Sequence, residues 1–465
     1  MTSSPVTSLS IPELRTAIRG RVITPDDAEY DSARAVMMGG IDRRPAAIVR
    51  VADAADVAEV VRIARDTGIE LAVRSGGHSS AGHSTTDGGI VIDLRDMRAI
   101  DIDPEAKTAW AETGLTAVAY STAVSAHGLG TGFGDTGSVG IGGITTGGGI
   151  GYLARRDGLT IDSLLAAEVV TADGELHRVD AVQEPDLFWA IRGGGGNFGV
   201  ATRFQFRLHE VDPFVGGLLL LPATPEVVEG FVALAEAAPD ELSTIANVMP
   251  CPPMPFVPED RHGELIILAF MAYAGPVDAA ERALAPFRAL AEPLADLVHP
   301  IAYPEIYPPD DPDYHPTAVA RTMFIDRVDL DVARLIVERL TASNATMRVA
   351  QLRVLGGAMA RVPNEATAFA HRHERILVNL AAFYEGPDDM IVRHAWVEEF
   401  VDALRQDSTS AYVNFVGDEG EAGVRSAYPG ATWDRLAAIK ARYDPTNLFR
   451  LNQNIPPLDA GTARA

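Results

Sequence analysis

The sequence has a single cysteine, Cys251, among 465 residues. One cysteine cannot form an intrachain disulfide, and it excludes zinc or iron–sulfur sites built from several cysteines. Long apolar runs are missing too: the longest in the middle of the chain is FVGGLLLLP, well short of the ~20 residues that a membrane-spanning helix needs. The chemistry of this protein must therefore come from other side chains or from an organic cofactor.

Positive charge is also scarce, because 39 Lys and Arg residues face 64 Asp and Glu residues and give a net charge of −25. This charge opposes binding to DNA, RNA or anionic lipid, so we expect neither nucleic acid nor membranes as partners. The N-terminus MTSSPVTSLSIPELRTAIRG lacks the basic start and the apolar stretch of a signal peptide. We expect a cytoplasmic protein, monomeric or homodimeric.

The 47% apolar and 22% charged fractions are those of an ordinary globular protein, and the length favours more than one domain. Glycine-rich loops dominate the chain up to about residue 211. Pro-punctuated strands and helices, without a comparable glycine-rich loop, follow. We predict three segments, 1–211, 212–410 and 411–465, the last with a helix capped by Thr432.

Near the start of the chain, the apolar spacing after Asp53 predicts an amphipathic helix that ends at Gly68. A short strand ending near Arg74 follows, then a glycine-rich turn and a second strand over 88–94. A further helix is predicted over 116–127. The cluster YPPDDPDYHP, much further along the chain, is predicted to be a surface loop.

Three stretches are unusually rich in glycine: RSGGHS at 74–79, GTGFGDTGSVGIGGITTGGGIG at 130–151 and AIRGGGGNFGVAT at 190–202. Glycine inside regular elements costs about 0.5–1 kcal/mol relative to alanine. A chain that keeps so many is expected to bring its backbone close to a ligand. Flexible linkers are the alternative, but aromatic and β-branched residues interrupt the runs.

By letters alone, the segments 149–154 and 194–199 match a dinucleotide fingerprint. That fingerprint requires a buried strand before it and a long helix after it. Here only YLARRD separates Gly151 from Gly158, and the residues after Gly199 alternate as in a strand. The segments still supply free backbone N–H groups for a pyrophosphate, so we predict a dinucleotide held by loops rather than a Rossmann fold.

Four motifs occur in order: RSGGHS, GGIVIDL, VGIGGITTGGGIGYLARRDGLTIDSLLAAEVVTADGE and DLFWAIRGGGGNFGVAT. Together they resemble the FAD-binding domain of the vanillyl-alcohol oxidase and p-cresol methylhydroxylase superfamily. The tail, AYVNF and then YDPTNLFRLNQNIPP, resembles the berberine bridge enzyme-like branch. The resemblance implies a two-domain α+β fold, in which an FAD-binding domain is joined to a substrate domain of an antiparallel sheet covered by helices.

The resemblance implies that His78 is bonded covalently to the 8α-methyl of FAD. From the residues alone, a satisfied loop histidine or a metal ligand paired with His83 would also be open. Many relatives carry a second tether, a cysteine, at the position of Thr136, and Cys251 is not expected to replace it because it lies in the other predicted domain. We therefore predict one covalent link, as in the 6-hydroxy-D-nicotine oxidase type, and no metal. A covalent link at this position raises the potential of the flavin and favours substrate oxidation.

The family motifs assign further residues to the cofactor. They are Arg74, Ser75, Gly76, Gly77, His78 and Ser79; Thr136, Gly137, Val139, Gly142, Gly143, Gly147, Gly148, Gly149 and Gly151; Gly199 and Val200; and Asn452 and Asn454. The position of Val139 gates oxygen in relatives, and valine resembles the oxygen-reactive members. A strand valine that merely fills space is the alternative.

Three residues are candidates for the chemistry. Tyr412 matches the tyrosine of the family's Y-x-N motif, which implies a role as base. A phenol titrates near ~10, so its anion needs a cation or hydrogen-bond donors, and Arg353 is our candidate. Asn379, alone in an apolar strand, cannot abstract a proton and would only orient substrate. Each residue also has a purely structural interpretation. Arg353 could be a solvated charge at the end of a strand, Tyr412 an ordinary packed tyrosine, and Asn379 a residue that faces a turn.

We predict a flavoprotein oxidase that acts on a small alcohol or amine and returns electrons to O2. A dehydrogenase of the same fold with another acceptor is the first alternative, and a noncatalytic flavin-binding protein is the second. An arginine at 353, where carbohydrate-oxidising relatives place an acid, argues against a sugar substrate.

Overall fold

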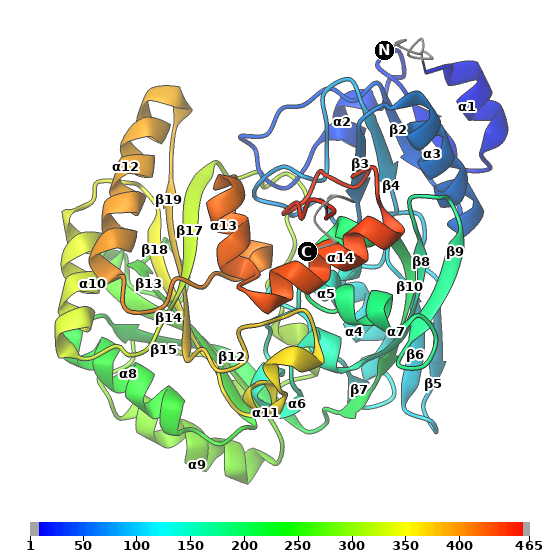
Figure 1. Ribbon diagram of the computed structural model, residues 1–465. Helices are drawn as coiled ribbons and strands as arrows, with labels where there is room; N and C mark the ends of the chain where they lie inside the picture. The colour runs from blue at the N-terminus through cyan, green and yellow to red at the C-terminus, as the bar shows by residue number, and fades with distance from the viewer. Residues whose placement is uncertain (1–8, 459–465) are drawn as a thin grey trace.

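The computed structural model describes residues 9–458 and has two parts that lie side by side (Figure 1). The N-terminal part contains a four-stranded sheet, a five-stranded sheet and a short two-stranded sheet of β7 (Leu129–Gly130) and β11 (His209–Glu210). The middle part contains one large sheet with helices on one face. This arrangement confirms the predicted α+β class and the helix-covered antiparallel sheet. Within residues 9–458, every helix is too short or too polar to cross a membrane.

The first sheet has the order β1-β2-β4-β3, with β2, β4 and β3 parallel. Its strands are β1 (Arg21–Ile23), β2 (Ala47–Arg50), β3 (Leu71–Arg74) and β4 (Ile90–Asp93). The helix α3 (Ala54–Thr67) begins as predicted, because the Asp53 side chain accepts hydrogen bonds from the N–H groups of Ala55 and Asp56. It ends at Gly68, whose φ of 70° lies in the left-handed region. Helices α1 (Ile11–Ala17) and α2 (Tyr30–Arg34) precede β2 in the chain.

The second sheet is antiparallel, with the order β5-β6-β10-β8-β9. Its strands are β5 (Ile100–Asp103), β6 (Thr108–Glu112), β8 (Leu164–Val170), β9 (Leu176–Asp180) and β10 (Val200–Arg207). Helices of this part are α4 (Ala117–Ser125), α5 (Ile141–Thr146), α6 (Ala154–Asp157) and α7 (Pro185–Ala190). After Gly151 comes only the four-residue α6, and after Gly199 comes the strand β10. Neither segment therefore supplies the long helix of a Rossmann site.

The large sheet has the order β15-β12-β14-β13-β18-β19-β17, and β16 pairs with β12. Its strands are β12 (Phe214–Pro222), β13 (Leu242–Pro250), β14 (Leu265–Ala274), β15 (Ala295–Asp296), β16 (His299–Pro300), β17 (Ala318–Ile325), β18 (Arg348–Val354) and β19 (Ile376–Phe383). Helices α8 (Pro225–Ala237), α9 (Val277–Arg288), α10 (Leu330–Ala342) and α12 (Gly386–Leu404) cover one face and share its apolar core. We call the opposite face, which is turned toward the N-terminal part, the inner face.

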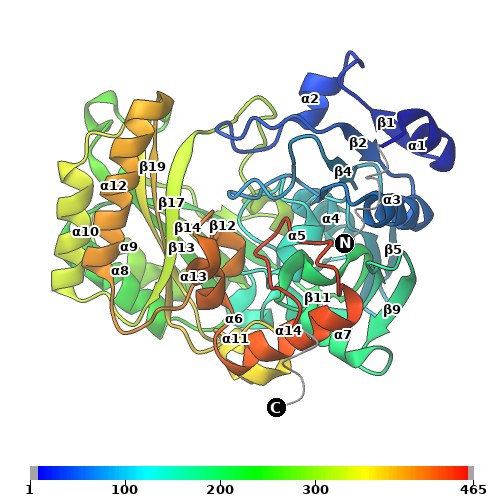
Figure 2. The same cartoon turned by 45° about the horizontal axis from the view of Figure 1, so that its top comes forward.

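The C-terminal part contains α13 (Gly420–Ala427) and α14 (Ala431–Tyr443), and α14 lies against α7 (Figure 2). The predicted cap Thr432 is wrong: the chain turns at Gly430, whose φ is 52°, and α14 begins one residue before Thr432. On the buried side of α14, Lys440 Nζ donates to Asn197 O at 2.7 Å, to Phe449 O at 2.9 Å and to Asp444 Oδ2 at 2.6 Å. This buried cluster fixes the path of the tail after the helix.

Buried arginines join the middle part to the N-terminal part. Arg372 forms two hydrogen bonds to the Asp162 carboxylate, at 2.7 and 2.9 Å, and is fully buried. Arg155 donates to Leu355 O at 2.6 Å and to Ala238 O at 2.8 Å. A charged group buried this deeply is stable only with partners in place, so these contacts fix how the two parts meet.

Candidate active site

Two of the predicted cofactor loops lie directly against each other. The Ser75 hydroxyl donates to Thr113 O at 2.5 Å and accepts from the Gly142 N–H at 3.3 Å. A Cβ atom on Gly76 would lie 2.2 Å from Gly140 N, and one on Gly140 would lie 2.1 Å from Ser75 Oγ. Glycine at 76 and 140 therefore allows the turn at 74–79 to touch the loop before α5.

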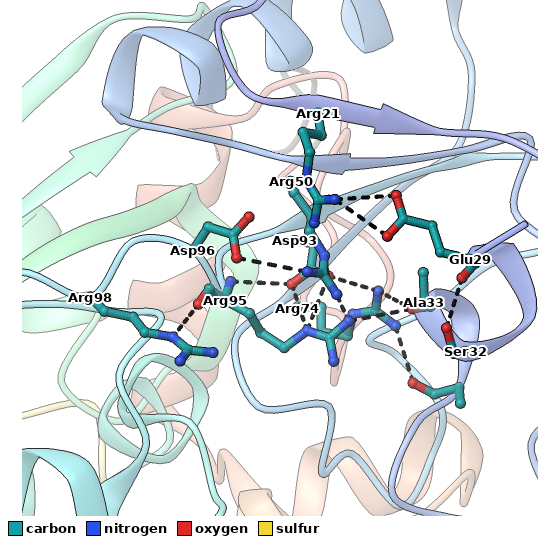
Figure 3. Close-up of polar contacts among 11 residues, drawn as sticks. Arg21, Glu29, Ser32, Ala33, Arg50, Arg74, Asp93, Arg95, Asp96 and Arg98 are labelled. Atoms are coloured by element: carbon teal, nitrogen blue, oxygen red, sulfur yellow. Dashed lines mark hydrogen bonds and ion pairs between the residues drawn. The ribbon is translucent and has the colours of Figure 1, made fainter. Parts of the chain in front are cut away.

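Arg74, predicted to contact the cofactor, points instead into the first sheet (Figure 3). Its Nη2 donates to Asp93 Oδ2 at 3.0 Å and to Ala33 O at 2.7 Å. Arg95 reaches the same carboxylate at 2.8 Å. Burial lowers the pKa of Arg74. With its guanidinium held in this way, Arg74 anchors the start of the turn.

His78 is partly exposed and lies beside the loop that carries Asp135 and Ser138. Burial lowers the pKa of His78, although Asp310, the Ser138 backbone and Asp135 act in the opposite direction. The neutral imidazole that results has a free ring-nitrogen lone pair, as a bond to carbon requires. Burial also lowers the pKa of His83 to about 4. Nowhere in residues 9–458 do three His, Cys, Asp or Glu side chains gather as a metal site would need.

Tyr412 lies behind the glycines of the second loop. Its phenol oxygen accepts hydrogen bonds from Gly149 N at 3.0 Å, Ile150 N at 3.2 Å and Asn414 Nδ2 at 2.9 Å. Burial raises the pKa of Tyr412, while these donors and, more weakly, Arg353 oppose the rise. Tyr412 is only 1% exposed, and Phe415 packs against its ring. The phenol is therefore enclosed in this arrangement rather than open to a substrate.

The glycines at 147–149 are needed for this packing. A Cβ on Gly147 would lie 1.9 Å from Asn414 Oδ1, and one on Gly149 would lie 1.9 Å from Thr160 Oγ1. A Cβ on Gly148 would lie 2.9 Å from the Phe369 ring. In the described residues these glycines face side chains of the chain itself.

Arg353, on the inner face, lines a small cavity between the two parts together with Ile150 and Ile245. Its Nη2 donates to Asp135 Oδ2 at 2.6 Å and to Gln351 Oε1 at 2.7 Å. The guanidinium also lies 4.9 Å from the centre of the Phe415 ring. Its main anionic partner is therefore Asp135 rather than the phenol of Tyr412.

A row of uncharged polar side chains continues across the inner face. Gln351 Nε2 donates to Asn247 Oδ1 at 2.9 Å, and Asn247 Nδ2 donates to Leu268 O at 3.1 Å. Asn379 is paired with Gln351 in the strand register and lies on the same face, since Val378 and Leu380 on either side of it pack under the helices. The structure thus brings Arg353 and Asn379 to one face.

The third loop and the tail also meet. Asn197 Nδ2 donates to Gln453 O at 3.1 Å, and its Oδ1 accepts from Ile455 N at 2.9 Å. Gln453 Nε2 in turn donates to Val416 O at 2.7 Å. Val200 is buried in the core with Phe449. These contacts hold Gln453 and Ile455 against the loop at 190–202, and Asn452 and Asn454 lie next to them in the chain.

The remaining predicted cofactor residues differ in how open they are. Partly exposed are Ser79, Thr136, Val139 and Gly199; Gly143 is exposed; Gly77, Gly137 and Gly142 are buried; and Gly151 lies so close to Phe133 O that a Cβ would clash with it. The open positions mark the side of the loop that a ligand can reach.

Several observations show that these loops fit FAD. In the described part of the chain, buried oxygens of Thr145, Asn452 and Asn454 have no hydrogen-bond partner, which is unusual for buried polar atoms. A Cβ on Gly143 would meet nothing within 4 Å. The loop that carries α5 and the C-terminal tail therefore retain unpaired oxygens, which can accept from the N–H and O–H groups of a dinucleotide, and open space beside Gly143.

Three residues at the site were not predicted. Asp135 and Gln351 both contact Arg353, and Asn414 contacts the phenol of Tyr412. Asn414 belongs to the Y-x-N motif and could have been found from it. Asp135 stands next to Thr136 in a stretch otherwise free of charge, which was the one signal for it.

The comparisons with known proteins agree with this arrangement. The model of an FAD binding domain matches residues 45–180, and the model described as berberine and berberine like matches 411–456. The (R)-6-hydroxynicotine oxidase of Paenarthrobacter nicotinovorans is 30% identical, with 95% of this chain and 97% of that protein aligned. The xylooligosaccharide oxidase of Thermothelomyces thermophilus is 29% identical, with 89% and 88% aligned.

Solved structures show the same fold. The crystal structure of 6-hydroxy-D-nicotine oxidase from Arthrobacter nicotinovorans has a TM-score of 0.85 at 27% identity, covering 98% of this chain and 100% of that one. A chitooligosaccharide oxidase, at 21% identity and a TM-score of 0.82, supports the fold alone. The chain belongs to the berberine bridge enzyme-like, p-cresol methylhydroxylase-type family of FAD-linked oxidoreductases.

Proposed function

We propose that this protein is an FAD-dependent oxidase that acts on a small alcohol or amine. The observation that carries the proposal is the position of the flavin loops, at His78 and 135–143, opposite the polar inner face at Arg353. FAD, once bound, supplies a two-electron acceptor at its N5 atom and a path to O2, which leaves as H2O2. The chain's own task is to orient the substrate and take its proton.

The covalent link is proposed at His78 alone. Support comes from its neutral, partly exposed imidazole beside the loop at 135–138, and from threonine rather than cysteine at 136. Precipitation of the purified protein with acid should give a yellow pellet. The His78→Ala protein should lose its colour in the same treatment, and a pellet that stays yellow would contradict the link.

The proton acceptor has two candidates. The resemblance implies Tyr412, and the three N–H donors around its oxygen favour the phenolate. If Tyr412 is the base, Tyr412→Phe should slow anaerobic flavin reduction by roughly 10²- to 10⁴-fold. The burial of its phenol weakens this assignment, and the second candidate, Asp135, is argued below. Asn379 is proposed to orient the substrate from the inner face.

Oxidase action is favoured over dehydrogenase action by Val139, which is partly exposed in the flavin loop. Release of H2O2 should be measured across a panel of alcohols, amines and sugars. Slow reoxidation of the reduced flavin in air-saturated buffer would instead indicate a dehydrogenase that uses another electron acceptor. An intact flavin that no member of the panel reduces would select a noncatalytic flavin-binding protein.

A further inference from the structure

Asp135 is a carboxylate that reaches across the interface between the two parts. Asp135 lies in the loop between β7 (Leu129–Gly130) and α5, and Arg353 on the inner face donates to its Oδ2 at 2.6 Å. The Asp135 side chain is 23% exposed, whereas Arg353 is 5% exposed. The arginine is therefore covered, and the carboxylate is the member of the pair that a small molecule can reach.

The surroundings of Asp135 place it at the centre of the proposed site. Its charge acts on His78, Tyr152 and Tyr307. Arg353, its partner, lines the cavity between the two parts. Arg353 is itself fixed by Gln351, which is held by Asn247, so the carboxylate meets a rigid donor.

We propose that Asp135 is the catalytic residue that takes the proton of the substrate, with Arg353 as its positioning residue. This assignment rests on the proposed oxidase function. The carboxylate binds the substrate O–H or N–H and accepts its proton, while the adjacent C–H gives its hydrogen and electron pair to the bound flavin. The substrate becomes a carbonyl compound or an imine. The proton held by Asp135 then leaves with the two electrons when O2 becomes H2O2, so the balance closes.

Tyr412 cannot do this as directly. Its oxygen is surrounded by three donors within the wall formed by residues 149–150 and Asn414. At 1% exposure, the phenol meets a substrate only after the wall opens. Asp135 needs no such movement.

The test compares Asp135→Asn and Asp135→Ala with a matched control, Asp162→Ala. Asp162 also bridges the two parts to a buried arginine, Arg372, at 2.7 Å, and its carboxylate pairs with that arginine rather than with Arg353. We expect Asp135→Asn to retain its flavin and slow anaerobic flavin reduction by roughly 10²- to 10⁴-fold. The control should lose stability and keep its reduction rate within a few-fold of wild type.

Formate supplies a readout that does not depend on turnover. Asp135→Ala leaves Arg353 without its anion, so added formate should bind there and raise the thermal midpoint of this variant as purified, and chloride should do so less. In the loaded enzyme, formate should restore part of the reduction rate of Asp135→Ala. For Asp162→Ala, formate should leave the rate unchanged.

The outcomes separate the two proposals. A reduction rate of Asp135→Asn within about ten-fold of wild type, or a loss of rate confined to Tyr412→Phe, overturns the role of Asp135 and leaves the oxidase function standing. A wild-type flavin that no alcohol, amine or sugar reduces overturns the function, and the role of Asp135 with it. Arg353→Met should shift the pH profile of reduction, and an unchanged profile would remove Arg353 from the positioning role.

Discussion

At the scale of single residues, the carboxylate of Asp93 is fully buried and forms ion pairs with three arginines (Figure 3). A substitution at this position is therefore expected to destabilise the N-terminal part. Asp93→Asn leaves the buried Arg74 without an anion, and removal of one partner of a buried pair costs about 3–5 kcal/mol. We expect a loss of that size in the free energy of urea unfolding. The exposed Asp101, paired with Arg203, is the control, and Asp101→Asn should cost at most about 1 kcal/mol.

The same carboxylate predicts a dependence on pH. Burial raises the pKa of Asp93, but Arg74 and Arg95 lower it by more, so the native pKa lies below the usual value. A native pKa below the unfolded one stabilises the fold above about pH 4, and this contribution is lost as the pH falls toward the native pKa. As the pH falls below about 4, the free energy of unfolding of Asp93→Asn should therefore decline less steeply than that of wild type. An equal decline for the two proteins would contradict the lowered pKa of Asp93.

At the scale of elements, α5 and the loop before it offer a matched pair of glycines. Gly140→Ala would push a methyl group to within 2.2 Å of the Gly76 backbone, so the turn at 74–79 must shift and the protein should be destabilised. The methyl group that Gly143→Ala adds has no atom of the described chain within 4 Å. Alanine inside a helix is more stable than glycine by roughly 0.5–1 kcal/mol.

Flavin content should be measured on each variant as purified, and thermal unfolding on protein prepared without the cofactor. Gly140→Ala should lower the thermal midpoint. Gly143→Ala should keep it and hold less flavin, because its methyl group enters the space proposed for FAD. A fully flavinated Gly143→Ala would show that the cofactor does not approach this side of α5.

Elements with local signals were predictable from the sequence. Asp53 and Gly68 bound α3 because capping and a left-handed end depend on neighbouring residues. Thr432 failed as a cap since Gly430 supplies the turn one step earlier. The pair Asp135–Arg353 joins positions 218 residues apart, and no local pattern encodes such a contact. The sequence therefore indicated the glycine-rich loops and the candidate Arg353, but not the carboxylate that pairs with Arg353.

At the scale of the whole molecule, the buried arginines predict that the two parts unfold together. Arg372→Met removes the partner of Asp162 across the interface and should cost about 3–5 kcal/mol. Circular dichroism and tryptophan fluorescence should report one coincident transition for wild type. Arg361→Met, which breaks an exposed pair with Asp240, is the control and should change the midpoint little. Two separate wild-type transitions would contradict the coupling.

The buried amine of Lys440, on α14, can be used to follow the release of the C-terminal tail by chemical labelling. The sequence contains two lysines, Lys107 and Lys440. Lys107 is 49% exposed, while Lys440 is fully buried and burial lowers its pKa. An acylating reagent should label Lys107 in the native protein and reach Lys440 only after the tail detaches. Mass spectrometry of the peptide that contains Lys440 would then measure the fraction of molecules that have released the tail, without any substitution in the chain.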